Sequence, residues 1–107
     1  MQQLSARDLA DWLQDDKRSK PLLLDVREPS EFERCAIAGS MLMPMGSITS
    51  RIAELDPAQE IVCICHHGGR SMQVAMYLSQ HDFTKLFNLS GGVHAWAQQI
   101  DENMPTY

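Results

Sequence analysis

The sequence predicts an α/β domain with a largely parallel sheet. Two short apolar runs, residues 21–26 and 60–65, each have the length of one buried strand. Segments whose apolar residues recur at helical spacing lie between and around these runs, and strands that alternate with helices are typical of parallel sheets. With 107 residues the chain has the length of a single domain.

The expected elements follow one another closely along the chain. Ser5 can cap the backbone N–H of Asp8, which predicts that a first helix begins there and carries Leu9, Trp12 and Leu13 on one face. The later elements are expected in this order: a strand at 21–26, a helix at 28–34, a strand at 40–43, a helix at 47–55, a strand at 60–65, a helix at 70–80, a strand at 85–89 and a helix at 93–100. The polar tail, residues 101–107, is expected to be loose.

Charge and composition exclude some partners and compartments. The formal net charge of -5 argues against nucleic acid or an anionic membrane as the main partner, because both attract basic surfaces. No apolar run approaches the ~18 residues that cross a bilayer, and the N-terminus lacks the features of a secretory signal. We therefore expect a cytoplasmic protein. An odd number of cysteines (Cys35, Cys63 and Cys65) then favours free or catalytic thiols over disulfides.

Residues 65–71 form the segment with candidate chemistry. They join the carboxyl end of a predicted strand to a helix, which is where α/β folds bind ligands. Gly68 and Gly69 can adopt positive φ, so that successive backbone N–H groups turn inward, and the helix adds its positive end. Arg70 adds a permanent charge. This cradle suits an anion, so Cys65 is expected to ionise more readily than a free cysteine and to act as a nucleophile.

Other residues of this segment have structural as well as functional explanations. His66 and His67 could add positive charge or contact an acceptor, or they could be exposed and inert. Cys63 fits a buried core thiol, with a resolving thiol for oxidised Cys65 as the alternative. A metal site built from these two cysteines and two histidines is not expected, because no further ligands with structural zinc spacing occur elsewhere. We therefore expect no metal and no cofactor.

The length of the loop separates two chemistries. Four residues lie between Cys65 and Arg70, whereas cysteine phosphatases cradle a phosphate with one residue more. The shorter loop suits a sulfur atom carried on the cysteine rather than a tetrahedral phosphate.

Four separated motifs make the chain resemble the rhodanese-like family. Residues 23–32 (LLDVREPSEF) are similar to the first strand of the family and the helix that follows it. Residues 37–40 (IAGS), followed by Pro44, resemble the stretch that leads into the next strand. Residues 65–70 (CHHGGR) resemble the six-residue active-site loop, and residues 89–92 (LSGG) resemble a motif near the C-terminal end of the family.

The resemblance implies a single domain over residues 1–107, with a five-stranded parallel sheet flanked by helices on both faces. It also implies a sulfurtransferase that moves a sulfane sulfur from a small anionic donor such as thiosulfate through a Cys65 persulfide. The acceptor would be a thiol, cyanide or a protein cysteine. Under this resemblance the residues that bind substrate would be His66, His67, Gly68, Gly69 and Arg70. Asp25 and Arg27 would support the loop, with a solvent-facing salt bridge as the alternative for Arg27.

Two departures from the family pattern leave questions open. Cys35 and Ala36 stand where the family often has Gly-His, so any contact made by that histidine is absent. Cys35 itself could be a second reactive thiol or a partly buried bystander. The interior of the loop is not the commonest one, which leaves the donor and acceptor open. Two other functions remain as alternatives: a non-catalytic interaction module, against which the retained Cys65 argues, and a cysteine-based phosphatase or arsenate reductase, against which the loop length argues.

Overall fold

A five-stranded parallel sheet with the strand order β1-β5-β4-β2-β3 organises the computed structural model, which describes residues 1–107. The strands are β1 (Gln2–Leu4), β2 (Leu22–Asp25), β3 (Met41–Leu42), β4 (Ile61–Ile64) and β5 (Leu86–Leu89). The α-helices are α1 (Ala6–Gln14), α2 (Pro29–Arg34), α3 (Ile48–Arg51), α4 (Gly69–Ser79) and α5 (Gly92–Gln99). The predicted fold class is confirmed.

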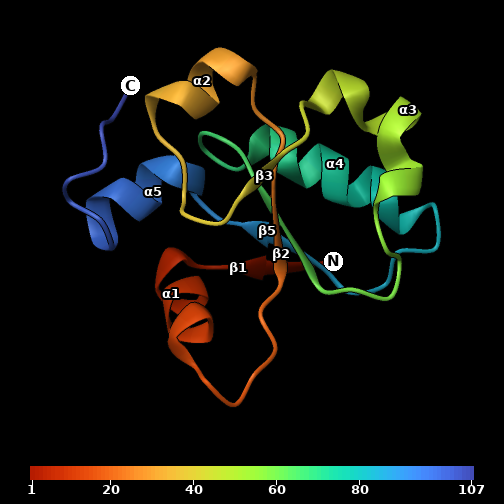
Figure 1. Ribbon diagram of the computed structural model, residues 1–107, viewed down its shortest axis with the longest axis horizontal. Coiled ribbons are helices and arrows are strands. Elements are labelled where there is room, and N and C mark those ends of the chain that lie inside the picture. Colours follow the sequence, from red (N-terminus) through yellow and green to blue (C-terminus); the bar gives the residue numbers. More distant parts are fainter.

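The central strand β4 separates two hydrophobic cores. Successive side chains of a strand point to opposite faces of the sheet, so every residue of an apolar strand can be buried when both faces are covered. Val62 and Ile64 contact the core formed with α1 and α5, whereas Ile61 and Cys63 contact the core formed with α3 and α4. Figure 1 shows α1 and α5 on one side of the strands and α3 and α4 on the other.

The boundaries of most elements follow their local sequence signals. Ser5 caps α1 as expected, because its side chain accepts a hydrogen bond from the backbone N–H of Asp8 at 3.0 Å. The helix expected at 47–55 is instead divided into the short α3 between two 3₁₀ turns, Met45–Ser47 and Ile52–Glu54. None of the helices has the length and apolar composition needed to cross a bilayer.

Strand β1 was not predicted, because its two glutamines give no apolar signal. Gln2, Gln3 and Leu4 pair in parallel with Phe87, Asn88 and Leu89 of β5 and form one edge of the sheet. The strand is therefore defined by its neighbour, and the side chains of Gln2 and Gln3 remain exposed.

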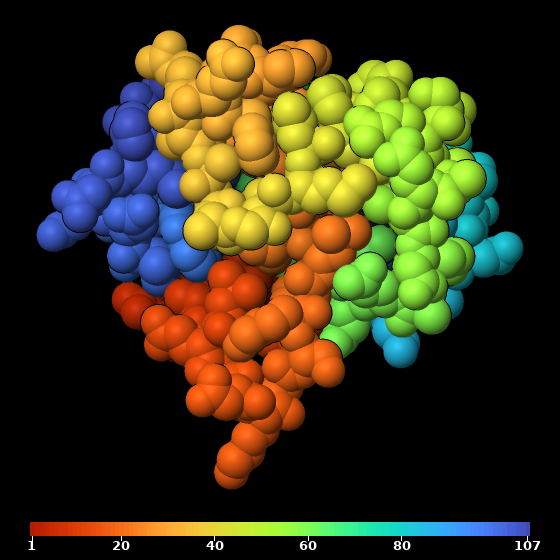
Figure 2. Space-filling model, in the orientation of Figure 1, coloured from red at the N-terminus to blue at the C-terminus, as the bar shows by residue number.

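The tail, residues 101–107, was expected to be loose, and the structure differs. The Met104 side chain is buried in the core beside α1 and α5. The hydroxyl of Tyr107 makes hydrogen bonds with Arg27 and Glu31, which no local sequence pattern indicates. Figures 1 and 2 show the C-terminal segment beside α2. Burial of Met104 and the hydrogen bonds of Tyr107 explain why this segment lies against the domain.

Candidate active site

Cys65 directly follows β4 and lies beneath the loop that leads into α4. Its side chain is almost completely buried, with an exposed fraction of 1% for the residue. The Gly68 backbone N–H donates a hydrogen bond to the Cys65 Sγ at 3.1 Å, and Ser71 Oγ lies 3.3 Å from the same sulfur. Gly68 has φ +111° and precedes the first turn of α4. Of the two glycines expected to adopt positive φ, only Gly68 does so, and the Gly68 N–H is the backbone donor that reaches the sulfur.

Ser71 and Asn88 extend the hydrogen-bond network around this sulfur. Asn88 of β5 is buried, and its Nδ2 donates to the Gly68 carbonyl at 3.1 Å and to Gln3 Oε1 at 3.0 Å. Its Oδ1 therefore faces Ser71 Oγ, with which it is hydrogen bonded. A hydroxyl has a single proton, so Ser71 can donate either to Asn88 or to an ionised Cys65 at any one time.

The first turn of α5 holds the loop through backbone contacts. Val93 N–H donates to the Cys65 carbonyl at 2.9 Å, and His94 N–H donates to the His66 carbonyl at 3.1 Å. Gly92 has φ +58°, and a Cβ at this position would lie 2.3 Å from the Cys65 carbonyl oxygen. Position 92 therefore needs glycine both for its backbone conformation and for the close approach of α5.

Arg70 forms an ion pair that the sequence did not reveal. Its Nη1 and Nη2 donate to Oε1 and Oε2 of Glu31 on α2, at 2.7 and 2.9 Å. These two hydrogen bonds lower the pKa of Glu31 to about 2, although its partial burial acts in the opposite direction. They also raise the pKa of Arg70. The charge predicted to bind a donor is thus already paired, and donor binding by Arg70 stays a prediction.

Asp25 and Arg27 form a buried ion pair beside α2. Both side chains are fully buried, and Arg27 Nη2 lies 2.7 Å from Asp25 Oδ2. The guanidinium also donates to the carbonyls of Glu31 and Cys35, at 3.3 and 2.7 Å. Burial acts to lower the pKa of Arg27, but the hydrogen bonds of Asp25 and Tyr107 raise it above its ordinary value. The alternative of a solvent-facing salt bridge is therefore wrong; these residues hold α2 and make no side-chain hydrogen bond to the loop itself.

Tyr107 connects the two ion pairs. Its hydroxyl accepts from Arg27 Nη1 at 2.8 Å and donates to Glu31 Oε2 at 2.9 Å. Its ring stacks on His66, with centroids 3.8 Å apart and planes 6° apart. Partial burial raises the pKa of Tyr107, against the effect of Arg27. Glu31 and Tyr107 were not predicted as parts of the site, since no local pattern connects residues so far apart along the chain.

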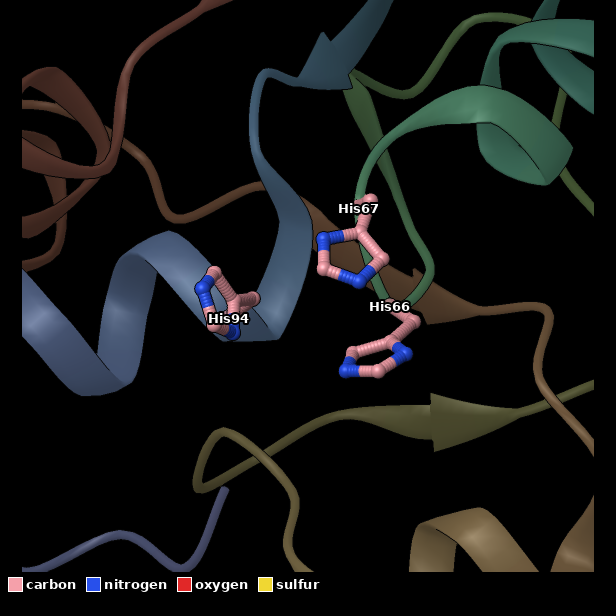
Figure 3. Close-up of side chains that lie close together, drawn as sticks. All are labelled: His66, His67 and His94. Carbon is pink, nitrogen blue, oxygen red and sulfur yellow. The ribbon is translucent and has the colours of Figure 1, made fainter. Parts of the chain in front are cut away.

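The loop histidines meet a third histidine from α5. Figure 3 shows the rings of His66 and His67 on the loop, with His94 beside them on the first turn of α5. Partial burial and the neighbouring His67 lower the pKa of His66, whereas Glu31 acts to raise it. A lowered pKa makes His66 largely neutral at pH 7, so it can donate or accept a hydrogen bond there but adds little charge.

The other two cysteines are buried away from solvent. Cys63 is fully buried, and its burial, together with the neighbouring Cys65, raises its pKa to about 12. It therefore remains a thiol at neutral pH, in agreement with its interpretation as a core residue. Cys35 is 8% exposed, and its Sγ lies 3.8 Å from Arg27 Nη1. All three cysteines are free.

Comparison with known proteins gives the family. A family model described as "Rhodanese-like domain" matches residues 5–99. The chain belongs to the rhodanese-like domain family. Its structure is similar to the crystal structure of a rhodanese-like domain protein from Staphylococcus aureus. The match covers 100% of this chain and 99% of that chain, with a TM-score of 0.85 and 25% identity.

Curated relatives of this rhodanese-like domain include proteins of different lengths. A sulfurtransferase from Allochromatium vinosum is 36% identical over 77 residues, which are 72% of each chain. The rhodanese-like/PpiC domain-containing protein 12 of Arabidopsis thaliana is 37% identical over 92 residues, and a probable adenylyltransferase/sulfurtransferase, MoeZ, of Mycobacterium tuberculosis is 34% identical over 106 residues. The chain spans only 30% and 26% of the lengths of these last two proteins.

Proposed function

We propose that this rhodanese-like domain is a sulfurtransferase that carries a sulfane sulfur on Cys65 as a persulfide. The observation that carries the proposal is the position of the Cys65 sulfur, which is buried at the end of β4 and accepts a hydrogen bond from the Gly68 backbone. Relatives named as sulfurtransferases support sulfur transfer as the general chemistry.

In the first step, the Cys65 thiolate attacks the outer sulfur of a small anionic donor such as thiosulfate. A bond forms between the Cys65 Sγ and that sulfur, and the sulfur–sulfur bond of thiosulfate breaks. The electron pair of the broken bond leaves with sulfite. The N-terminus of α4 and the backbone N–H groups of the loop stabilise the negative charge on the persulfide.

In the second step, a thiophilic acceptor attacks the outer sulfur of the persulfide. A thiol, cyanide or a cysteine of a partner protein would each take this sulfur, and the electron pair of the broken Sγ–S bond returns to Cys65. Ser71 supports this return because its hydroxyl, 3.3 Å from the sulfur, can turn from Asn88 and donate to the regenerated thiolate.

The test is the intact mass of the purified protein after incubation with thiosulfate. We expect a gain of one sulfur atom that a reductant removes, in the wild type and in the matched control Cys35→Ser. The near-isosteric Cys65→Ser should keep the fold and lose the gain. A reducible gain that persists in Cys65→Ser would contradict the proposal and place the carrier on another thiol.

A second assay separates sulfur transfer from the chemistry of cysteine phosphatases. We expect the wild type to release thiocyanate from thiosulfate and cyanide, and to leave a generic aryl phosphate intact. Hydrolysis of the phosphate without any sulfur loading would overturn both the proposed reaction and the argument from loop length.

A further inference from the structure

Three imidazole rings converge beside the active-site loop. His66 and His67 belong to the loop, and His94 belongs to the first turn of α5 (Figure 3). The ring centroid of His67 lies 3.9 Å from the ring centroid of His66 and 4.9 Å from that of His94. One ring nitrogen from each of the three residues lies within 4.8 Å of the other two. The fold has therefore gathered three metal-ligating side chains from two elements.

Two ring nitrogens in this cluster lack hydrogen-bond partners. His66 Nε2 and His94 Nδ1 are both buried and make no hydrogen bond. A buried polar atom without a partner destabilises a fold, so each such atom requires an explanation, for example a bound ion, ligand or water. A metal ion would satisfy nitrogens of this kind, because it accepts the lone pair of a neutral imidazole.

Neighbouring groups hold the His66 ring and the His94 backbone in place. His66 is stacked on Tyr107, and the backbone N–H of His94 donates to the His66 carbonyl at 3.1 Å. Coordination bonds of 2.0–2.1 Å require nitrogens about 3.3 Å apart in a tetrahedral site. His67 is exposed and can rotate to close the remaining distance.

We propose that His66, His67 and His94 bind one divalent transition-metal ion of the kind that prefers imidazole, such as Zn²⁺ or Co²⁺. Three protein ligands leave a fourth coordination position open, as in metal sites that exchange water for another ligand. The bound ion would cross-link the loop to α5. This site does not rest on the proposed sulfur transfer, since none of its three ligands is a thiol. This proposal departs from our expectation of no metal, which considered His66 and His67 together with two cysteines and did not consider His94.

The first experiment is a Co²⁺ titration of the untagged protein, followed by visible ligand-field absorption, with Zn²⁺ added afterwards as competitor. We expect one Co²⁺ per chain, displaced by Zn²⁺. His94→Ala and His67→Ala should each weaken binding about tenfold or more, by analogy with the losses seen when metal sites are disturbed. The matched control is His81→Ala, because His81 is exposed just beyond the C-terminal end of α4, where its ring lies against Tyr77, and is not part of the cluster. It should bind as the wild type does.

Cys65→Ser identifies the ligands independently of sulfur transfer. We expect it to bind Co²⁺ with the wild-type affinity and without a thiolate-to-cobalt charge-transfer band. Loss of binding in Cys65→Ser would place the ion on the thiolate and overturn the three-histidine site. The site would also be overturned if the wild type bound no Co²⁺, or if His94→Ala and His67→Ala both bound it as the wild type does. Circular dichroism and thermal unfolding of each variant show whether a loss of affinity reflects a loss of fold. A failure of sulfur loading leaves this result unaffected.

Discussion

Replacement of Glu31 by glutamine tests whether one carboxylate joins the loop to α2. Glu31 accepts two hydrogen bonds from Arg70 and one from Tyr107, and its pKa falls from 4.5 to about 2. This lowering sets a ceiling of about 3 kcal/mol on the contribution of the ionised carboxylate, since a tenfold change in an equilibrium is worth about 1.4 kcal/mol. The Arg70 side chain is 37% exposed, so solvent screens the pair, and we expect Glu31→Gln to lower the free energy of unfolding at pH 7 by about 1–2 kcal/mol.

The pH dependence of this effect distinguishes charge from packing. Because the pKa of Glu31 is lower in the folded protein than its ordinary value, the stabilisation is complete above about pH 4.5 and is lost as the pH falls towards 2. Urea unfolding of the wild type and of Glu31→Gln from pH 7 to pH 3 should therefore show a difference that shrinks with falling pH.

The matched control for this experiment is Glu54→Gln. Glu54 also accepts two hydrogen bonds from an arginine, Arg51, but the Glu54 side chain is 49% exposed, whereas that of Glu31 is 19% exposed. We expect no measurable change in unfolding for the control, because solvent screens exposed pairs. An effect of Glu31→Gln that is the same at all pH values, or that the control reproduces, would refute the reasoning.

Three further predictions address the neighbours of the loop. Tyr107→Phe keeps the ring that stacks on His66 but removes two hydrogen bonds, so urea unfolding should show a free energy of unfolding lower by about 1–2 kcal/mol. An unchanged free energy of unfolding would mean that Tyr107 contributes only its ring. Gly92→Ala should lower the free energy of unfolding by about 3 kcal/mol and impair sulfur loading, whereas the control Gly46→Ala, whose Cβ meets nothing within 4 Å, should do neither. Equal effects of the two substitutions would show that α5 does not constrain the loop. Arg70→Ala should raise the KM for thiosulfate more than Glu31→Gln does; equal effects of the two substitutions would make Arg70 purely a positioning residue for the loop.

Local patterns in the sequence predicted most of the fold and the centre of the site. The apolar run that forms β4, the glycines that follow it and the cap at Ser5 each act within a few residues, so their structural meaning can be interpreted without knowledge of distant partners. β1 lacks such a signal, because Gln2 and Gln3 join the sheet only by pairing with β5.

The contacts that surround the loop could not be predicted in the same way. Glu31 and Arg70 are 39 positions apart, and Glu31 and Tyr107 are 76 positions apart. Nothing in the residues near Tyr107 indicates that its hydroxyl has two charged partners. Asn88 presents a similar case, since a single buried amide on a strand gives no sign that it orients Ser71 beneath the candidate nucleophile.

The backbone contacts between α5 and the loop hold the loop without using the side chains of positions 66 and 67. Val93 and His94 bind the carbonyls of positions 65 and 66 through main-chain atoms, which every amino acid except proline provides at the donor positions. The side chains at positions 66 and 67 can consequently be exchanged while the scaffold still holds Cys65. Exchanging these two side chains, with the sheet and the flanking helices left as they are, is therefore the direct way to test whether His66 and His67 contact the donor or the acceptor.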